Sequence, residues 1–251
     1  MSKPGDAKEL SGKVAIVTGS SSGIGEATAV SLAQLGVHVV VNSATSVDTG
    51  KKVTAALATE GHYVQADISD QAQGKHLVDE TIKKFGRLDI LVNNAGWTTL
   101  VPHTDLDALT DEIFDKTFKV NVYGTWWLTK AAIPYLRKSD DGNVVTVTSI
   151  AGIRPMGSSM AYAMTKAALN HMTLLLAKSY GPTRFNAVAP GLVQTPWTKD
   201  WGAMHDGVSK MSPMKRSAYP SDCSQAVLSL VCNPHVTGQV LVVDGGFTLV
   251  S

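Results

Sequence analysis

The sequence predicts one α/β domain spanning residues 1–251, in which helices cover both faces of a doubly wound parallel sheet of about seven strands. Short β-branched runs alternate with longer helical patterns along nearly the whole chain, which is typical of parallel strands joined by helices. The length of 251 residues suits a single domain, since α/β domains of about 250 residues are common. No linker, repeat or low-complexity segment divides the chain.

The expected strands are short runs rich in Val, Ile and Ala. The first is Val14-Ala15-Ile16-Val17, and a Gly-rich turn follows it directly. Later runs recur after each helical pattern, so right-handed connections between them would lay the strands parallel. We expect strands at residues 14–17, 37–41, 63–66, 90–92, 144–147, 186–188 and 240–243.

The expected helices occupy the segments between these runs. The first is rich in Ala and stops at Gly36, because glycine readily adopts the conformation that ends a helix. The turn residues Asp140-Asp141-Gly142-Asn143 separate the central helices from the fifth strand. We expect helices at about residues 26–34, 48–60, 71–85, 161–180 and 221–231, with two more within residues 107–137.

Residues 192–219 break this alternation. The segment contains two Trp and three Met residues but has neither a strand pattern nor a clean helical period. It is either a surface excursion packed on the core or a flexible apolar flap over a pocket. Its place after the sixth strand favours a mobile substrate flap.

Composition and charge exclude several classes of protein. The 22 basic and 21 acidic residues leave a net charge of +1 without a Lys/Arg block, so neither nucleic acid nor an anionic membrane is an expected partner. An apolar share of 44% excludes a disordered chain. No apolar run approaches the ~20 residues that span a bilayer, and the polar residues 1–13 lack the pattern of a signal or transit peptide. We expect a cytoplasmic protein.

Neither a disulfide framework nor a metal site is expected. Cys223 and Cys232 lack CxxC spacing and have no His pair nearby. The seven histidines are scattered without an HExxH pattern, so surface or packing roles are the default for each. His205, within residues 192–219, is kept as a possible substrate contact.

A Gly-rich turn follows the first strand and precedes the first helix. It reads Thr18-Gly19-Ser20-Ser21-Ser22-Gly23-Ile24-Gly25, a G-x-x-x-G-x-G spacing that differs from the G-x-G-x-x-G dinucleotide fingerprint. Glycines let the backbone approach a pyrophosphate, whose charge then meets the free N–H groups at the start of the helix. A tight turn with only a structural role is the alternative.

A tyrosine and a lysine four residues apart suggest proton-transfer chemistry. Tyr162 and Lys166 differ by ~40° in direction and ~6 Å in height on a helix, so both project from one face. Such a pair is often mere packing, but this one opens a helix just past Ser149, at the carboxyl end of a strand, where doubly wound sheets bind ligands. The Lys166 ammonium would lower the phenol pKa from its usual ~10, and Ser149 would donate to a substrate oxygen.

Taken together, these motifs resemble one enzyme family. The glycine spacing, then Asn93-Asn94-Ala95-Gly96, Ser149, Tyr162-Ala163-Met164-Thr165-Lys166 and Pro190-Gly191, resembles the short-chain dehydrogenase/reductase family in its compact, single-domain Rossmann-type form. The match runs from residue 10 to residue 250, and 3-oxoacyl-acyl-carrier-protein reductases and related ketoreductases look most similar. The resemblance implies interconversion of a ketone and a secondary alcohol by hydride transfer, with Tyr162 as acid/base.

The resemblance also assigns residues to the cofactor and to catalysis. Ser149, Tyr162 and Lys166 would be joined by Asn121, whose backbone would hold a water; an amide at a helix kink is the alternative. The Asp67 carboxylate would accept a hydrogen bond from adenine, or else cap a helix. The implied cofactor-binding set is Gly19, Ser21, Ser22, Gly23, Ile24, Gly25, Ser43, Ala44, Thr45, Asp67, Ile68, Asn94, Ala95, Gly96, Tyr162, Lys166, Pro190, Gly191, Val193 and Thr195.

The end of the second strand bears on the choice between NADP(H) and NAD(H). NAD enzymes usually place a carboxylate there to bind the ribose 2′-hydroxyl, whereas this strand ends Asn42-Ser43-Ala44-Thr45-Ser46. The Ser43 and Thr45 hydroxyls resemble a 2′-phosphate loop, and Ser22 could add a donor. Two observations oppose NADP(H): Ser22 occupies the position where family members often have an Arg, and Asp48 lies close to this strand end in the sequence. We expect NADP(H), with NAD(H) as the alternative.

The substrate and partners follow from the loops at the catalytic end. We expect the walls of the substrate pocket to come from residues 97–103, 150–157 and 192–219. These segments contain Trp97, Met156, Trp197 and Trp201, which predicts a moderately bulky apolar carbonyl or alcohol substrate. Arg154 would pair with a substrate anion or stay exposed. A basic patch for an acyl-carrier protein would be formed by Lys130, Arg137, Lys138 and Lys178, and dispersed solvated surface is the alternative for these residues.

The family resemblance further implies a homotetramer paired through central helices and last strands. Two other functions stay open. One is an NAD-preferring alcohol dehydrogenase of the same family. The other is a non-catalytic NADP-binding regulator, although such proteins typically lose the tyrosine or the lysine, and both are present here.

Overall fold

A computed structural model describes residues 10–251 and contains one seven-stranded parallel sheet. The strand order is β3-β2-β1-β4-β5-β6-β7, and every paired strand runs parallel to its neighbour. The predicted fold class is confirmed. The strands are β1 (Val14–Val17), β2 (His38–Ser43), β3 (Gly61–Gln65), β4 (Ile90–Asn93), β5 (Asn143–Val147), β6 (Arg184–Pro190) and β7 (Val240–Val243).

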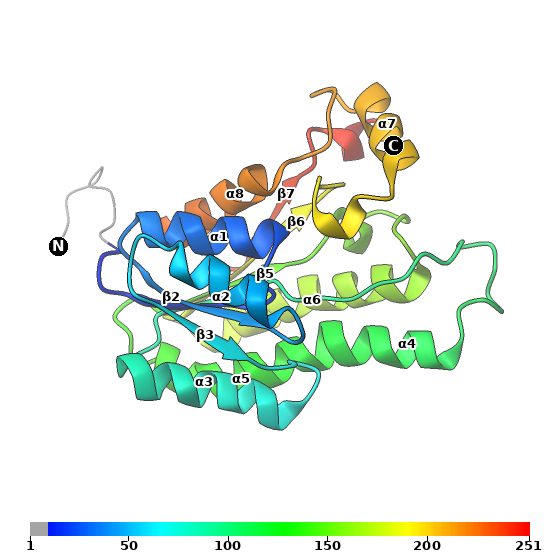
Figure 1. Ribbon diagram of the computed structural model, residues 1–251. Helices are drawn as coiled ribbons and strands as arrows, with labels where there is room; N and C mark the ends of the chain where they lie inside the picture. Colours follow the sequence, from blue (N-terminus) through cyan, green and yellow to red (C-terminus); the bar gives the residue numbers. More distant parts are fainter. Residues whose placement is uncertain (1–9) are drawn as a thin grey trace.

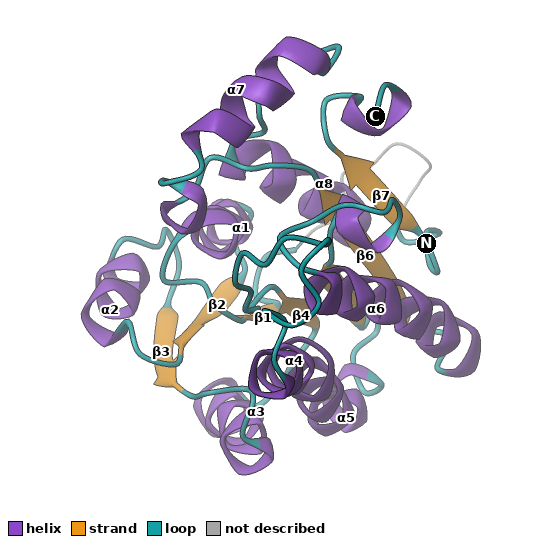
Figure 2. Cartoon of the chain, turned by 90° about the vertical axis from the view of Figure 1, so that its right-hand side faces the viewer, coloured by secondary structure: helices purple, strands orange, loops and turns teal. Residues whose placement is uncertain are grey.

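The helices lie on both sides of this sheet, as Figure 2 shows. They are α1 (Gly23–Gln34), α2 (Val47–Ala55), α3 (Gln71–Phe85), α4 (Asp111–Phe118), α5 (Thr125–Leu136), α6 (Met160–Ser179), α7 (Gly202–Met211) and α8 (Pro220–Cys232). A π-helical segment, η1 (Lys119–Gly124), joins α4 to α5 without a break. Short 3-10 turns occur at η2 (Ile150–Gly152), η3 (Pro196–Thr198) and η4 (Phe247–Leu249).

Two apolar layers hold the sheet between its helices. Successive side chains of a strand point to opposite faces, so Ala15 and Val17 of β1 pack in one layer and Ile16 packs in the other. The first layer includes Leu32 of α1 and Val227 of α8; the second is built from α3, α5 and α6. Because both faces are covered, β1 is apolar throughout and β4 is apolar up to Asn93, which explains why these two strands read as apolar runs.

The topology fixes where a ligand can bind. The chain winds outward from β1 through β2 to β3, then returns to β4 on the other side of β1. Figure 1 labels β2 and β3, and Figure 2 also labels β1 and β4. At this reversal the loops after β1 and β4 leave the sheet in opposite directions and open a crevice at their carboxyl ends. The Gly-rich turn follows β1, and Asn94 follows β4, so both reach this crevice.

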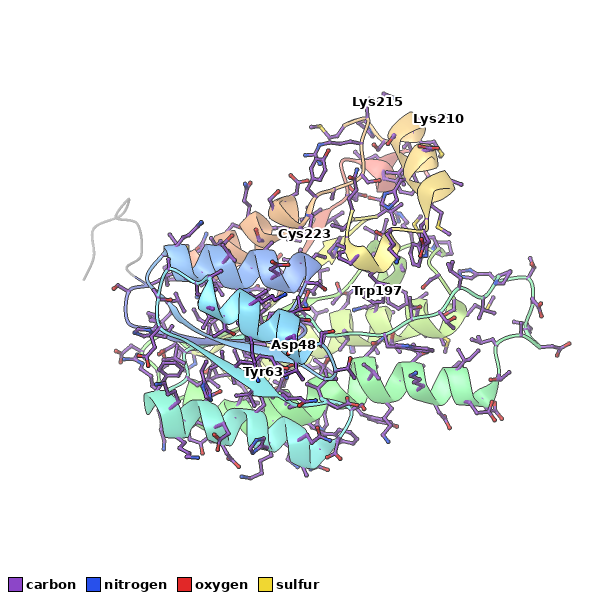
Figure 3. The ribbon with its side chains drawn as sticks, in the orientation of Figure 1. Asp48, Tyr63, Trp197, Lys210, Lys215 and Cys223 are labelled. Atoms are coloured by element: carbon purple, nitrogen blue, oxygen red, sulfur yellow. The ribbon has the colours of Figure 1, made fainter. Side chains whose placement is uncertain are left out.

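The segment 192–219 contains more helix than its sequence suggests. It folds into η3 and α7, and α7 buries none of its residues, all of which are described. The helix is only ten residues long and contributes nothing to the core, so its apolar pattern is too short to stand out in the sequence. Figure 3 shows Lys210 and Lys215 at the outer end of this segment. Its two ends meet where Val193 and Ala218 form a parallel bridge.

Other boundaries differ slightly from the expected ones. Helix α2 ends at Ala55 rather than near residue 60, because the Thr59 hydroxyl donates to the carbonyl oxygen of Val37 in the return to the sheet. The expectation about residues 1–13 concerns in part residues 1–9, which lie outside the described range. Among the helices of residues 10–251, none has the length and apolar character that crossing a membrane requires.

Candidate active site

The Gly-rich turn after β1 is held against the loop after β4. Gly19 and Gly23 have φ angles of +61° and +59°, values that favour glycine. The Thr18 hydroxyl oxygen accepts the backbone N–H groups of Asn94 and Ala95 at 3.0 Å, and the Asn94 side-chain amide donates to the carbonyl oxygens of Thr18 and Gly19. The two loops therefore form one rigid unit at the crevice.

The start of α1 points into this crevice with its N–H groups uncapped. Ser22 is the N-cap residue, and its side chain makes no capping hydrogen bond. An uncapped helix start beside two glycines suits an anionic pyrophosphate, because the free N–H groups and the helix dipole both favour negative charge. On this observation the residues fit the phosphate groups of a dinucleotide.

A cavity of about 880 Å³ runs from this turn to the carboxyl ends of β5 and β6. Nineteen of the twenty predicted cofactor residues line this cavity, Tyr162, Lys166 and Pro190 among them. Gly25 lies behind the wall, where an added Cβ would be 2.5 Å from the Asn94 side-chain nitrogen. The structure thus gathers the predicted positions at one site.

At the end of β2 the structure separates the predicted hydroxyls. Asn42 is buried and its side-chain amide donates to the carbonyl oxygens of Val64 and Ala66. Ser43 is also buried, with its hydroxyl 2.8 Å from the Tyr63 hydroxyl, whereas Thr45 is exposed at the cavity. Of the two predicted hydroxyls, that of Thr45 is the one left open to a ligand.

Asp67 lines the cavity but does not cap the following helix. Its Oδ1 accepts the backbone N–H of Ser69 at 2.9 Å, while Asp70 caps α3 by accepting from Ala72 and Gln73. The helix-cap alternative for Asp67 is therefore wrong. The carboxylate sits at the far end of the cavity from Tyr162 and borders the place predicted for adenine.

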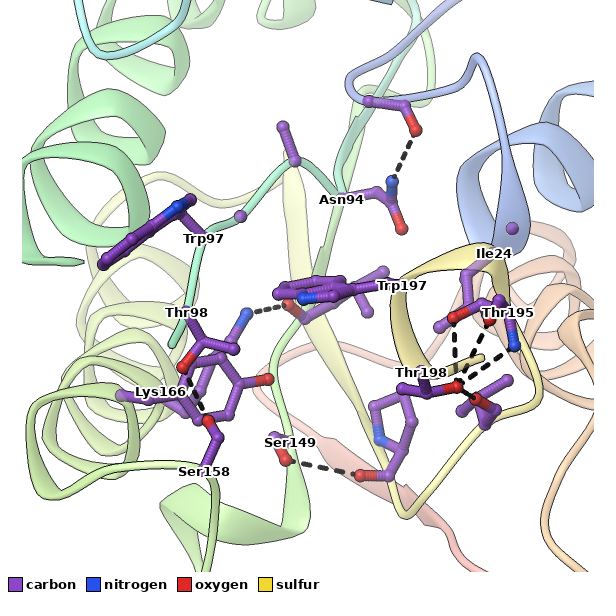
Figure 4. Close-up of a pocket in the computed structure, with 18 of the residues that line it drawn as sticks. Ile24, Asn94, Trp97, Thr98, Ser149, Ser158, Lys166, Thr195, Trp197 and Thr198 are labelled. Carbon is purple, nitrogen blue, oxygen red and sulfur yellow. Dashed lines mark hydrogen bonds between the residues drawn. The ribbon is translucent and has the colours of Figure 1, made fainter. Parts of the chain in front are cut away.

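Ser149, Tyr162 and Lys166 line the opposite end of the same cavity, and Figure 4 shows Ser149 and Lys166 there. Ser149 follows β5 and caps η2; its hydroxyl oxygen accepts from the N–H of Ala151 at 3.1 Å, and the hydroxyl donates to the carbonyl oxygen of Pro190 at a long 3.5 Å. Tyr162 lies in the first turn of α6, whose N-cap, Ser159, accepts from its backbone N–H. The weakly held Ser149 proton is free to turn toward a substrate.

Lys166 is buried and placed one turn along α6 from Tyr162. Its ammonium donates to the carbonyl oxygen of Val147 at 2.9 Å and lies 5.4 Å from the centre of the Tyr162 ring. An added Cβ on Gly96 would be 3.7 Å from Lys166 Nζ, so this glycine leaves room beside the ammonium. The i, i+4 geometry expected for the pair is present.

Burial, rather than the neighbouring charge, sets the acidity of this pair. Removal from water raises the pKa of Tyr162 to about 12, although a hydrogen bond with the Ser149 hydroxyl acts in the lowering direction. Burial also lowers the pKa of Lys166 to about 8. The expectation that the pKa of Tyr162 is lowered is wrong here, because removal of the phenolate from water dominates and only the Ser149 hydrogen bond opposes it.

Asn121 lies in the π-helical segment η1 and is fully buried. Its side-chain oxygen accepts from the backbone N–H of Trp97 at 2.7 Å, and its side-chain nitrogen donates to the Trp97 carbonyl oxygen and the Thr165 hydroxyl. Asn121 does not line the cavity; it anchors the loop after β4 to α6 from behind. The helix irregularity expected around this residue is present.

The substrate end of the cavity has mostly apolar walls. Trp97, Met156, Trp197 and Trp201 all line it, as predicted, and Trp197 projects toward Gly96, where an added Cβ would be 3.9 Å from its ring (Figure 4). Met204, Val208 and Met211 of α7 complete the flap side. Residues of the segment 192–219 thus line the pocket, and its role as a mobile substrate flap stays a prediction.

Two predicted substrate contacts lie elsewhere. Arg154 is exposed and does not line the cavity. His205 also lies outside the lining, because its ring is hydrogen-bonded to Ser217 and Thr198 inside the flap. Its suggested role as a substrate contact is not supported by this placement.

Sequence reasoning missed several lining residues, among them Lys116 and Phe247. Lys116 Nζ lies 4.4 Å from the centre of the Trp97 ring, at the edge of the cavity. A lysine on a charged helix reads as solvated surface, so no pattern marked it. Phe247 comes from the turn after β7, and only the folded path of the chain brings it to the pocket.

Comparisons with known proteins agree with this geometry. The family model described as enoyl-(acyl carrier protein) reductase matches residues 19–248. A relative from Streptomyces violaceoruber, named as ketoacyl reductase 2 of the granaticin polyketide synthase, is 50% identical over 237 residues, which cover 93% of this chain and 95% of that protein. The chain belongs to the short-chain dehydrogenase/reductase family.

Further members of the short-chain dehydrogenase/reductase family support the assignment. The 3-oxoacyl-acyl-carrier-protein reductase of Thermotoga maritima is 34% identical over 249 residues, covering 96% of this chain and 99% of that protein. The crystal structure of a Brucella melitensis 3-ketoacyl-(acyl-carrier-protein) reductase complexed with NADH superposes with a TM-score of 0.88 at 31% identity, covering 95% and 99% of the two chains. This short-chain dehydrogenase/reductase is an oxidoreductase acting on CH–OH donors, and the comparisons imply a nicotinamide cofactor.

Proposed function

We propose that the protein interconverts a ketone and a secondary alcohol with NADP(H), using Tyr162 as the acid and base. The observation that carries the proposal is the shared cavity: Ser149, Tyr162 and Lys166 line one end, and the Gly-rich turn with the uncapped start of α1 lines the other. A bound nicotinamide supplies or accepts hydride at the substrate carbon.

The side chains divide the remaining work. In the reducing direction Ser149 turns its hydroxyl from Pro190 to the substrate oxygen, stabilising the negative charge that develops there. Tyr162 donates its proton to the same oxygen, and a phenol kept protonated by burial is ready to do so. Lys166 holds positive charge beside the resulting phenolate. In the oxidising direction the proton returns to Tyr162.

The region around Thr45 supports NADP(H). No carboxylate occupies the end of β2, and the exposed Thr45 hydroxyl and the Ser22 side chain both line the cavity. Asp48 lies in the first turn of α2 and opposes this preference through its charge. Neutral donors accept a 2′-phosphate that a carboxylate would repel.

A substitution at Thr45 tests this preference. Thr45→Asp should lower kcat/KM for NADPH by about tenfold or more, because the new carboxylate repels the 2′-phosphate, while activity with NADH is kept or increased. Initial rates with both nucleotides measure the ratio, and Thr104→Asp, exposed and outside the cavity, is the control. A wild-type enzyme that clearly prefers NADH would overturn the NADP(H) assignment.

The apolar walls favour a bulky apolar ketone, and the names of two relatives suggest a ketoacyl compound. A panel of cyclic and open-chain ketones with NADPH, followed by the loss of nicotinamide absorbance, tests the proposed reaction. Turnover of a ketone to a secondary alcohol supports it; nucleotide binding without turnover of any ketone would favour a regulatory protein. An acyl-carrier protein as partner, a homotetramer and a cytoplasmic location remain further predictions.

A further inference from the structure

Helix α7 forms one side of the substrate pocket, yet little holds it in place. Met204, Val208 and Met211 of this helix line the cavity, but none of its ten residues is buried. Apolar packing therefore contributes little to its position. The position of α7 must therefore depend more on specific hydrogen bonds from the helix to the rest of the flap.

The imidazole of His205 makes such bonds to both sides of the flap. Its Nδ1 lies 2.8 Å from the Ser217 hydroxyl, and its Nε2 lies 3.3 Å from the carbonyl oxygen of Thr198 and from the Thr198 hydroxyl. A neutral ring satisfies this arrangement when Nε2–H donates to the Thr198 carbonyl and Nδ1 accepts from Ser217. One side chain thus ties α7 to the segment before it and to the segment after it.

Thr198 connects this histidine to the proposed nicotinamide-binding segment. The Thr198 hydroxyl is buried, donates to the carbonyl oxygen of Val193 at 2.5 Å and accepts from the backbone N–H of Thr195 at 3.3 Å. Val193 and Thr195 are the residues expected to hold the carboxamide. A shift of the His205 ring would therefore disturb Thr198, which is hydrogen-bonded directly to Val193 and Thr195.

Ser217 provides the second connection to the same place. It precedes Ala218, whose carbonyl oxygen accepts from the N–H of Gln194 at 2.8 Å and whose N–H donates to the carbonyl oxygen of Leu192 at 3.0 Å. Both partners of His205 are thus joined to residues 192–195. The ring closes a small network between the substrate flap and the cofactor site.

We propose that His205 is a positioning residue that couples the place of α7 to the nicotinamide-binding segment at residues 193–195. It touches neither substrate nor cofactor, and it acts through Thr198 and Ser217. The inference rests on the proposed function, because the coupling matters only if this segment binds a nicotinamide. Binding of the nucleotide then orders the flap, and loss of the imidazole weakens both events together.

The test compares His205→Ala and His205→Gln with Asp206→Ala, an exposed neighbour on α7. Binding is measured directly by titrating NADPH against the fluorescence of the cavity tryptophans, and flap order is measured as the rate of trypsin cleavage after Lys199, Lys210 and Lys215 with and without NADPH. We expect His205→Ala to weaken NADPH binding and raise its KM about tenfold, as the loss of a charge-free hydrogen-bond pair would. Protection by NADPH against trypsin should fall with it.

The controls separate positioning from folding. His205→Gln keeps one donor and should recover part of the affinity, and Asp206→Ala should behave as wild type. Where His205→Ala does not fold, Ser217→Ala removes one partner and should weaken NADPH binding in the same direction. The inference would be overturned if the folded variant, His205→Ala or its substitute Ser217→Ala, kept its NADPH affinity and its protection by NADPH against trypsin within twofold of the wild-type values. Wild-type protein that binds neither NADPH nor NADH would instead overturn the proposed function on which it rests.

Discussion

Single residues at this site gain their chemistry from burial. The phenol of Tyr162 and the ammonium of Lys166 are both shifted toward their neutral forms. Identity and spacing of these residues were readable from the sequence, but the direction of the Tyr162 pKa was not, because desolvation depends on what packs around the ring. The same limit explains Ser43, whose hydroxyl is bonded to Tyr63 of a neighbouring strand, and His205, whose partners lie far away in the chain.

Tyr162→Phe removes the proposed acid without changing the ring. Turnover should fall at least about a hundredfold, since positioned proton transfer contributes roughly 10²–10⁴-fold. NADPH affinity should stay within about twofold. Steady-state rates and fluorescence titration give the two quantities, and Tyr123→Phe, which alters an exposed phenol outside the cavity, serves as control. Retained turnover would remove Tyr162 from its role.

Lys166 should give the apoprotein a characteristic dependence of stability on pH. Its folded pKa of about 8 lies below the unfolded value of 10.5, so from pH 8 to 10.5 the unfolded chain holds more protons. This group therefore makes the free energy of unfolding rise with pH through that window. Relative to Lys166→Met, wild type should gain about 2 kcal/mol between pH 7 and 9.5.

Urea unfolding of both proteins at the two pH values measures this gain. Tyr162 does not cancel it, because its raised pKa affects stability only above pH 10, where stability would fall as the unfolded phenol loses its proton first. Parallel pH profiles for the two proteins would show that Lys166 is not shifted.

The arrangement of the elements around the site depends on glycines that let neighbouring segments of backbone pack closely together. Glycines of the turn after β1 were recognisable from sequence, but the reason for each became visible only in the fold: Gly25 packs against the Asn94 side chain and the carbonyl oxygen of Gly19. Likewise the helix α7 was not predicted, because its apolar residues Met204, Val208 and Met211 form only a short helical pattern in a ten-residue element. The long helix α6, with buried residues recurring along it, was predicted almost to its ends.

Gly25→Ala should disrupt the join between the turn and the loop after β4. The new Cβ would lie 2.5 Å from both Asn94 Nδ2 and the Gly19 carbonyl oxygen, so backbone must move. We expect a loss of about 1–3 kcal/mol in unfolding free energy together with weaker NADPH binding. Gly74→Ala, a glycine of α3 with no atom within 4 Å of the added Cβ, should leave binding unchanged and stabilise by up to about 1 kcal/mol.

For the whole molecule, alternation of strand and helix was enough to predict the sheet, its strand number and its direction. The order of strands follows from right-handed connections and one reversal, which places the crevice between β1 and β4. What lay beyond prediction was the set of contacts between segments distant in sequence, such as Phe247 at the pocket or the Val193–Ala218 bridge. No local pattern encodes such contacts.

The family resemblance predicts a homotetramer, and we expect its subunits to pair through exposed apolar side chains. Exposed apolar side chains are present on α5 and α6, including Trp126, Met164 and Leu175, and on the last strand and tail, including Leu241 and Leu249. Sedimentation should give about four times the 26.5 kDa of one chain. Trp126→Glu should lower that mass, because it would bury a charge where two helices meet in the tetramer. Lys130→Glu changes a residue that is already charged and should have less effect. A monomeric wild-type protein would contradict the prediction.

The π-helical segment η1 lies in the middle of a continuous helical stretch from residue 111 to residue 136 and rotates its two halves relative to each other. An α-helix turns about 100° per residue, so one widened turn rotates everything after it relative to everything before. Lys116 and Val120 consequently look into the cavity, while Leu128 and Ala132 look into the apolar layer beneath the sheet. Substitutions at the cavity-lining positions of the first half can therefore change which molecule the pocket admits, while the packing of α5 against the sheet stays the same.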